Sequence, residues 1–149
     1  MTGAANTAAA LAVQPAVAEA LDKWHAMIAA GDLSELPALL HPQVVFRSPM
    51  AFKPYVGAPL VTLILGTVVK VFEDFHYHRQ LASADGRNVV LEFAARVAGR
   101  ELKGIDMIRF DEQGKIVEFE VMIRPMSGLQ VLGDEMARRL APLLSGQMP

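Results

Sequence analysis

The sequence contains no cysteine, and this absence excludes thiol nucleophiles, disulfides and thiolate metal sites. It also lacks an excess of either charge, because 14 lysine and arginine residues stand against 16 aspartate and glutamate residues. A chain balanced in this way carries no electrostatic footprint for nucleic acid. A glycine-rich phosphate loop and a Gly-x-Ser-x-Gly elbow are missing as well. We therefore expect no nucleic-acid partner and no bound cofactor.

Long hydrophobic runs are also missing. The longest uncharged apolar stretch within the expected fold, residues 54–69, is interrupted by Gly57, Pro59 and Gly66, so it is too short and too broken to span a membrane. No lysine or arginine precedes Lys23, which leaves out the positively charged start of a signal peptide. We expect a cytoplasmic protein without a membrane partner.

What the sequence has in surplus is apolar residues. Hydrophobic residues make up 52% of the chain and charged residues 20%, and an excess of this kind serves an internal pocket or a partner interface. The length of 149 residues suits one domain with a sizeable core, and we find no internal repeat or linker. We expect residues 1–14, which are rich in alanine and uncharged, to form a frayed leader before a single domain over 15–149.

The spacing of apolar residues predicts both helices and strands. Helical spacing recurs after Pro15 up to Gly31, in a short segment after Asp32, over 58–74 and over about 128–143. Strand spacing is found over 44–46, 75–84, 87–98, 101–110 and 115–124, and turn residues separate the last four of these segments. This order predicts an α+β domain in which helices lie on one face of a curved antiparallel sheet.

Alternation along the strand over 101–110 assigns Asp106 to the same side as Leu102, Ile108 and Phe110. It is the only carboxylate on the apolar face of the predicted sheet. A buried carboxylate must be paired or neutral, and a neutral carboxylic acid can donate a hydrogen bond to a carbonyl or a developing oxyanion. The alternative is a structural role, in which Asp106 bonds main-chain amides or a nearby tyrosine or tryptophan.

The segment 105–116, Ile-Asp-Met-Ile-Arg-Phe-Asp-Glu-Gln-Gly-Lys-Ile, closely resembles a strand-turn-strand unit of the nuclear-transport-factor-2-like superfamily, in its ketosteroid isomerase and SnoaL-like polyketide cyclase branch. The resemblance covers about residues 17–125. It implies a cone-shaped cystatin-like fold, with a curved sheet wrapped around helices and an apolar pocket. It also places Asp106 at the position of the oxyanion-hole aspartic acid, which the apolar site keeps neutral in the isomerases.

Two other functional positions of the isomerases differ in this chain. The resemblance places Ser48 where the family has its general-base aspartate, and Trp24 where it has an oxyanion tyrosine. A serine without its own base is no proton acceptor, and an indole N–H only donates. We therefore do not expect steroid isomerisation as the family performs it. His25, next to Trp24, is a candidate general base, although a solvated helix histidine is the simpler interpretation.

Further candidates for ligand contact lie in the loop after the first strand and on the inward sheet face. Met50, Phe52 and Tyr55 stand where a pocket mouth is expected, and they suit either a binding loop or a packed lid. On the inward face we expect Phe93, Ile108, Phe119 and Val121 to line the pocket.

A pair of histidines on one strand is the closest approach to a metal site. His76 and His78 flank Tyr77 on one side of the strand, but no third ligand stands at a compatible spacing, so we predict no metal site there.

The outward face of the same sheet mixes apolar and charged groups. It carries Ile105, Met107, Met122, Arg109, Arg124, Glu118 and Glu120. This composition suits a protein interface better than a solvated wall, and the family commonly dimerises through this surface. We expect a homodimer.

Three functional hypotheses remain open. The first is an isomerase, cyclase or lyase-like enzyme acting on a small apolar carbonyl compound, in which neutral Asp106 donates to the carbonyl with help from Trp24, and His25 or the substrate supplies the base. The second is a non-catalytic domain that binds such a ligand on the same scaffold. The third is a dimeric interaction module whose pocket is filled by side chains.

Overall fold

The computed structural model describes residues 11–144. Of the predicted leader, residues 1–10 lie outside the described residues. The helices are α2 (Pro15–Ala30), α3 (Ala58–Val71) and α4 (Met126–Leu144), with a single 3₁₀ turn η1 (Leu36–Leu39). The strands are β1 (Leu40–Arg47), β2 (Tyr55–Val56), β3 (Glu73–Ala82), β4 (Asn88–Val97), β5 (Arg100–Phe110) and β6 (Ile116–Arg124).

The bounds of the first helix follow from local chemistry. Pro15 occupies the first turn of α2, where its missing N–H costs nothing, and Gly31 ends the helix in the left-handed conformation at φ 67°. The short helix predicted after Asp32 is only the 3₁₀ turn η1. Pro37 lies in it, and the Asp32 carboxylate accepts the backbone N–H of Ser34 in a local turn at 2.9 Å.

The helix predicted over 58–74 ends three residues earlier than expected. Phe72 has an extended backbone, and β3 begins at Glu73. β3 therefore covers residues 73–82 in place of the predicted 75–84.

The sheet has the strand order β2-β1-β6-β5-β4-β3. The four strands from β3 to β6 form the predicted antiparallel meander, but β1 pairs with β6 in parallel, so the sheet is mixed rather than wholly antiparallel. A bulge also shifts the predicted alternation in β6. Arg109 pairs with Glu118 and Phe110 pairs with Ile116, which leaves Val117 as the extra residue. Ile116 therefore faces the core in place of Val117 and is 1% exposed.

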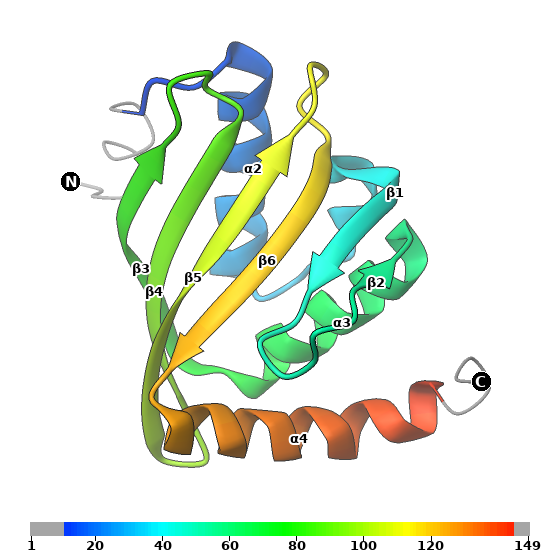
Figure 1. Cartoon of the computed structure of the whole chain (residues 1–149), viewed down its shortest axis with the longest axis vertical. Coiled ribbons are helices and arrows are strands. Elements are labelled where there is room, and N and C mark those ends of the chain that lie inside the picture. The colour runs from blue at the N-terminus through cyan, green and yellow to red at the C-terminus, as the bar shows by residue number, and fades with distance from the viewer. Residues whose placement is uncertain (1–10, 145–149) are drawn as a thin grey trace.

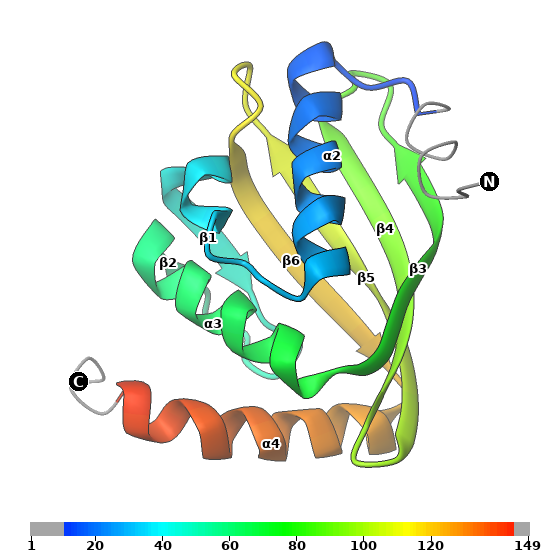
Figure 2. The same ribbon diagram turned by 180° about the vertical axis from the view of Figure 1, so that it is seen from behind.

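The helices lie against one face of the curved sheet. Figure 2 shows α2 and α3 in front of the strands, and α4 runs across the end of the sheet, where it contacts α3. Figure 1 shows the opposite face of β4, β5 and β6 with no described element over it. We call the covered side the inner face and the other the outer face. None of the helices within residues 11–144 combines the length and the apolar character needed to cross a bilayer.

Candidate functional site

A cavity of about 480 Å³ lies between the inner face of the sheet and the three α-helices. Most of its wall is aliphatic or aromatic, with contributions from every α-helix. Within residues 11–144, the side chains in this wall that carry a nitrogen or oxygen atom are Trp24, Ser48, Tyr55, Tyr77 and Asp106. Asp106 is the only carboxylic acid among them, and neither histidine, lysine nor arginine joins them.

Asp106 belongs to a chain of hydrogen bonds that connects three elements. The Tyr77 hydroxyl donates to Asp106 Oδ2 at 2.6 Å, and Trp24 Nε1–H donates to the Tyr77 hydroxyl oxygen at 3.0 Å. Tyr77 comes from β3, Asp106 from β5 and Trp24 from α2. The side chains meet because alternation turns both strand residues to the inner face, where α2 packs.

Burial controls the acid–base properties of this group. Asp106 is 6% exposed, and loss of hydration raises its pKa from 3.8 to about 7, although the hydrogen bond from Tyr77 acts in the opposite direction. Burial, and then the nearby Asp106 charge, raises the pKa of Tyr77 well above 10.0. The phenol therefore keeps its proton, and Asp106 is the group that titrates near neutral pH.

The hydrogen bond from Tyr77 also determines where the acid carries its own proton. Oδ2 accepts from Tyr77, and Oδ1 has no hydrogen-bond partner among the described residues. When Asp106 is neutral, its proton therefore resides on Oδ1, which is free to donate to a molecule in the cavity.

The predicted ligand contacts divide into two groups. Those that line the cavity with Asp106 and Trp24 are Ser48, Met50, Tyr55, Phe93, Phe119 and Val121. Phe52 does not line it, because the loop turns this side chain fully into solvent. Ile108 does not line it either, because it packs inside the core and is 1% exposed.

Two predicted roles need correction. Trp24 was expected to help Asp106 donate to a ligand, but its single N–H is already donated to Tyr77. His25 is a candidate general base in the sequence, with a solvated helix histidine as the simpler interpretation, but its ring is half-buried rather than solvated, lies edge-on against Tyr77 with ring centres 5.3 Å apart, and is absent from the cavity wall. Burial lowers the pKa of His25, which keeps the imidazole neutral.

Sequence reasoning missed Tyr77 as a site residue. The signal was present, because Tyr77 alternates with the exposed His76 and His78 and must face the opposite side, together with Phe75. The contribution of α4 was missed too, since Leu132 and Met136 were predicted only as helix residues and both line the cavity.

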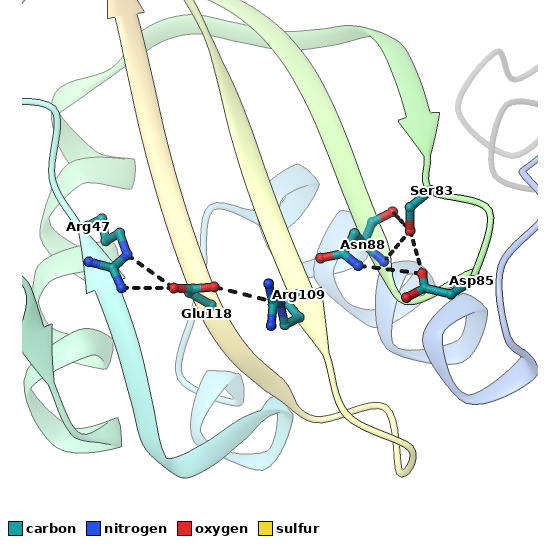
Figure 3. Close-up of polar contacts among 6 residues, drawn as sticks. All are labelled: Arg47, Ser83, Asp85, Asn88, Arg109 and Glu118. Carbon is teal, nitrogen blue, oxygen red and sulfur yellow. Dashed lines mark hydrogen bonds and ion pairs between the residues drawn. The ribbon is translucent and has the colours of Figure 1, made fainter.

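Several charged groups of the outer face form ion pairs away from the cavity. Figure 3 shows Glu118 between Arg47 and Arg109, at 3.0 and 3.7 Å. The same figure shows Asp85 in a turn network with Ser83 and Asn88, in which the Ser83 hydroxyl donates to Asp85 at 2.5 Å. Both clusters are accounted for by pairing or turn formation.

The histidine pair lies on the exposed side of β3. The rings of His76 and His78 are 5.2 Å apart. Within residues 11–144 there is no group of three or more histidine, cysteine, aspartate or glutamate side chains that could hold a metal ion.

The fold and the buried acid define a class of protein, an α+β domain with a nuclear-transport-factor-2-like isomerase or cyclase scaffold. Residues 21–119 match the SnoaL-like domain, and the chain belongs to this family. No curated protein matches the chain.

Solved structures agree with this assignment. The chain is similar to a steroid delta-isomerase from Pseudomonas aeruginosa, with 68% identity, a TM-score of 0.89 and coverage of 91% of this chain and 99% of that one. It is also similar to an uncharacterised bacterial protein with a cystatin-like fold from Silicibacter pomeroyi DSS-3, with 33% identity, a TM-score of 0.77 and coverage of 85% and 90%. A nuclear-transport-factor-2-like protein of unknown function from Mesorhizobium loti shares the fold at 16% identity, with a TM-score of 0.65 over 74% of this chain and 92% of that one.

Proposed function

We propose that this chain binds a small, largely apolar carbonyl compound in its cavity, and that neutral Asp106 donates a hydrogen bond from Oδ1 to the carbonyl oxygen. The observation that carries the proposal is the lone acid on an apolar wall, 6% exposed, with a pKa of about 7 and one oxygen held by Tyr77. The cavity of about 480 Å³ falls in the range of small-molecule sites.

A donor in this position polarises a bound carbonyl and stabilises an oxyanion that develops from it. Turnover of the isomerase type is the second candidate, and the named activity of the 68% identical relative favours it. Moving a proton also requires an acceptor. Ser48 lines the cavity without a carboxylate or histidine beside it in the wall, so under this proposal the acceptor belongs to the substrate or to a bound water.

The test is the pH dependence of ketone binding. Ionisation of Asp106 removes the donor, so the affinity for the ketone androstanone should decrease as the pH rises through about 7. Asp106→Asn should bind less tightly than the wild type at low pH but without this pH dependence, because its amide can still donate and does not ionise. Asp106→Leu should lose about fivefold in affinity at pH 6.

Glu92→Gln is the matched control, because Glu92 lies on the outer face of the neighbouring strand and should leave binding unchanged. Ketone binding that is equally tight in Asp106→Leu, or a pH profile that survives in Asp106→Asn, would disprove the role of Asp106. Turnover is scored separately with an unsaturated steroid ketone, whose absorbance reports a shift of the double bond.

We propose in addition that the outer face joins two copies of the chain. Met122 is 45% exposed and Met107 is 36% exposed, and they lie on strands that also carry acids and arginines. A two-fold axis brings the same face of both copies together, so arginines of one copy can pair with acids of the other. Sedimentation should show a dimer that Met122→Lys weakens and that Phe52→Lys, an exposed control in the loop, does not. A monomeric wild type at micromolar concentration would contradict the dimer.

A further inference from the structure

Two exposed histidines on β3 lie outside the cavity and take no part in the proposed binding of a ketone. His76 and His78 flank Tyr77 in the sequence, and they lie on the exposed side of the strand, opposite Tyr77. The centres of the two imidazole rings are 5.2 Å apart. We propose that this pair chelates one divalent transition-metal ion, Cu²⁺ ahead of Zn²⁺, and that water fills the remaining coordination positions.

The distance between the two rings suits a shared ion. Imidazole nitrogens bind Zn²⁺ at about 2.0–2.1 Å, so two rings on neighbouring coordination positions of one ion have their centres about 5 Å apart. The observed separation of 5.2 Å agrees with this value, so no backbone movement is needed to bring the rings together. Both side chains are exposed, and each ring is free to turn a nitrogen towards the ion.

A hydrogen bond already orients His76 as a metal ligand. Its Nδ1 lies 3.1 Å from the backbone carbonyl oxygen of Asp74. A carbonyl only accepts, so Nδ1 carries the hydrogen in this bond, and the lone pair of the neutral ring is on Nε2. Metal-bound histidines commonly donate their other N–H to a backbone carbonyl in this way, which fixes the ring and raises the basicity of the ligating nitrogen.

A bulge in β3 sets the direction of His78. Tyr77 pairs with Phe93 of β4 and Arg79 pairs with Glu92, which leaves His78 as the extra residue. Bulges re-aim a side chain relative to its neighbours. β3 is also the last strand of the sheet, and no strand within residues 11–144 pairs with its free edge. An ion and its water molecules therefore have room beside the two histidines.

The chemistry of the side chains selects the metal. Among the described residues no group of three or more possible ligands holds an ion, and the nearby Asp74 carboxylate is paired with Arg96. A site of two ligands completed by water is compatible with that finding. Mg²⁺ and Ca²⁺ need oxygen ligands and do not suit two imidazoles. Cu²⁺ does, because it binds nitrogen ligands more strongly than the other divalent first-row ions.

Titration of the full chain with Cu²⁺, followed by calorimetry and electron paramagnetic resonance, tests the site. We expect the wild type to bind Cu²⁺ more tightly than Zn²⁺, with two nitrogens coupled to the copper, and we expect Mg²⁺ not to compete. His76→Gln and His78→Gln should each weaken Cu²⁺ binding by about 100-fold, because a single imidazole no longer chelates. The double variant should lose little more than either single variant, since the first substitution has already removed the chelate.

His41→Gln is the matched control. The Nδ1 of His41 already accepts the backbone N–H of Gln43, and none of the ring contacts within residues 11–144 places a second histidine beside it, so Cu²⁺ binding should stay unchanged. Urea unfolding without metal should show wild-type stability in both single variants, because both histidines are exposed.

Three results would overturn the chelate. They are tight Cu²⁺ binding that survives in the double variant, a loss of binding that depends on only one of the two histidines, and a spectrum with a single nitrogen coupled to the copper. Because His76 and His78 are absent from the cavity wall, ketone binding should be the same in both variants as in the wild type. The metal site and the proposed function therefore stand or fall separately.

Discussion

Asp106 and Glu92 are both carboxylic acids on neighbouring strands, but they lie on opposite faces of the sheet. Glu92 pairs across the strands with Ile105, the residue immediately before Asp106. On the outer face, Arg79 donates to Glu92 at 2.9 Å and Lys103 lies 3.3 Å away, and the hydrogen bond from Arg79 is the main cause of its lowered pKa. On the inner face, no cation lies beside Asp106 within residues 11–144, and burial raises its pKa to about 7.

Asp106 and Glu92 differ because the face of the sheet on which a carboxyl group lies decides whether it is charged and ion-paired or neutral and able to donate a hydrogen bond. A charged carboxylate on the outer face is useful for ion pairs and for a protein partner. The same group on the inner face loses its hydration, becomes neutral near physiological pH and turns into a donor. Because side chains alternate along a strand, a shift of one residue separates these two chemistries.

The largest expected effect of this contrast is on stability as a function of pH. The folded pKa of Asp106 is about 7 and its ordinary value is 3.8, so the folded protein holds a proton that the unfolded chain releases between these values. The contribution to the free energy of unfolding is therefore complete below pH 3.8 and is lost as the pH rises to about 7. The total loss is about 4 kcal/mol.

Asp106→Asn does not ionise and should remove this pH dependence. We expect wild type and variant to differ least near pH 4, and the variant to become more stable than the wild type by up to about 4 kcal/mol at pH 8. Urea unfolding at a series of pH values measures the difference, in which the other titrating groups cancel. A difference that does not change with pH would show that Asp106 is not held neutral.

Part of this site could be predicted from the sequence, and part could not. Strict alternation in β5 was enough to place Asp106 on the apolar face, because the side-chain period of a strand is two. The partners of Asp106 depend on contacts that are distant in sequence. Tyr77 reaches it from β3 across β4, and Trp24 reaches Tyr77 from α2, so neither contact follows from local periodicity.

The departures in the fold have both local and long-range causes. Consecutive apolar residues at Ile116 and Val117 allow either one to face inward, and the bulge selects Ile116. Pro37 and the local turn at Asp32 leave room for only one 3₁₀ turn before β1. The parallel pairing of β1 with β6 joins segments about seventy residues apart, and the alternation pattern is the same for either direction.

A smaller effect is expected from Tyr77→Phe, which removes the only hydrogen bond to Asp106 among the described residues. The change leaves Asp106 Oδ2 and Trp24 Nε1–H without their partner, which should cost about 1–3 kcal/mol in the free energy of unfolding at pH 6. Because the bond from Tyr77 favours the charged form, the pKa of Asp106 should rise above its wild-type value of about 7.

Carbon NMR of the Asp106 carboxyl measures that pKa directly. Tyr55→Phe is the matched control, because the Tyr55 hydroxyl has no hydrogen-bond partner among the described residues, and we expect it to leave the pKa in place. An unchanged or lower pKa in Tyr77→Phe would mean that the phenol does not donate to the ionised acid.

The smallest expected effect is that of Glu92→Gln, and its dependence on pH should have the opposite sign. Ion pairing lowers the folded pKa of Glu92 below 4.5, so its contribution to stability is present above pH 4.5 and is lost as the pH falls through the folded pKa. The variant should therefore be slightly less stable than the wild type at pH 7 and equal to it in strong acid. High salt should shrink the difference, since Arg79 and Lys103, the cations that pair with Glu92, are exposed to solvent, whereas salt should hardly alter the Asp106 effect. If both substitutions changed stability in the same direction with pH, the two faces would not differ in the way that their surroundings require.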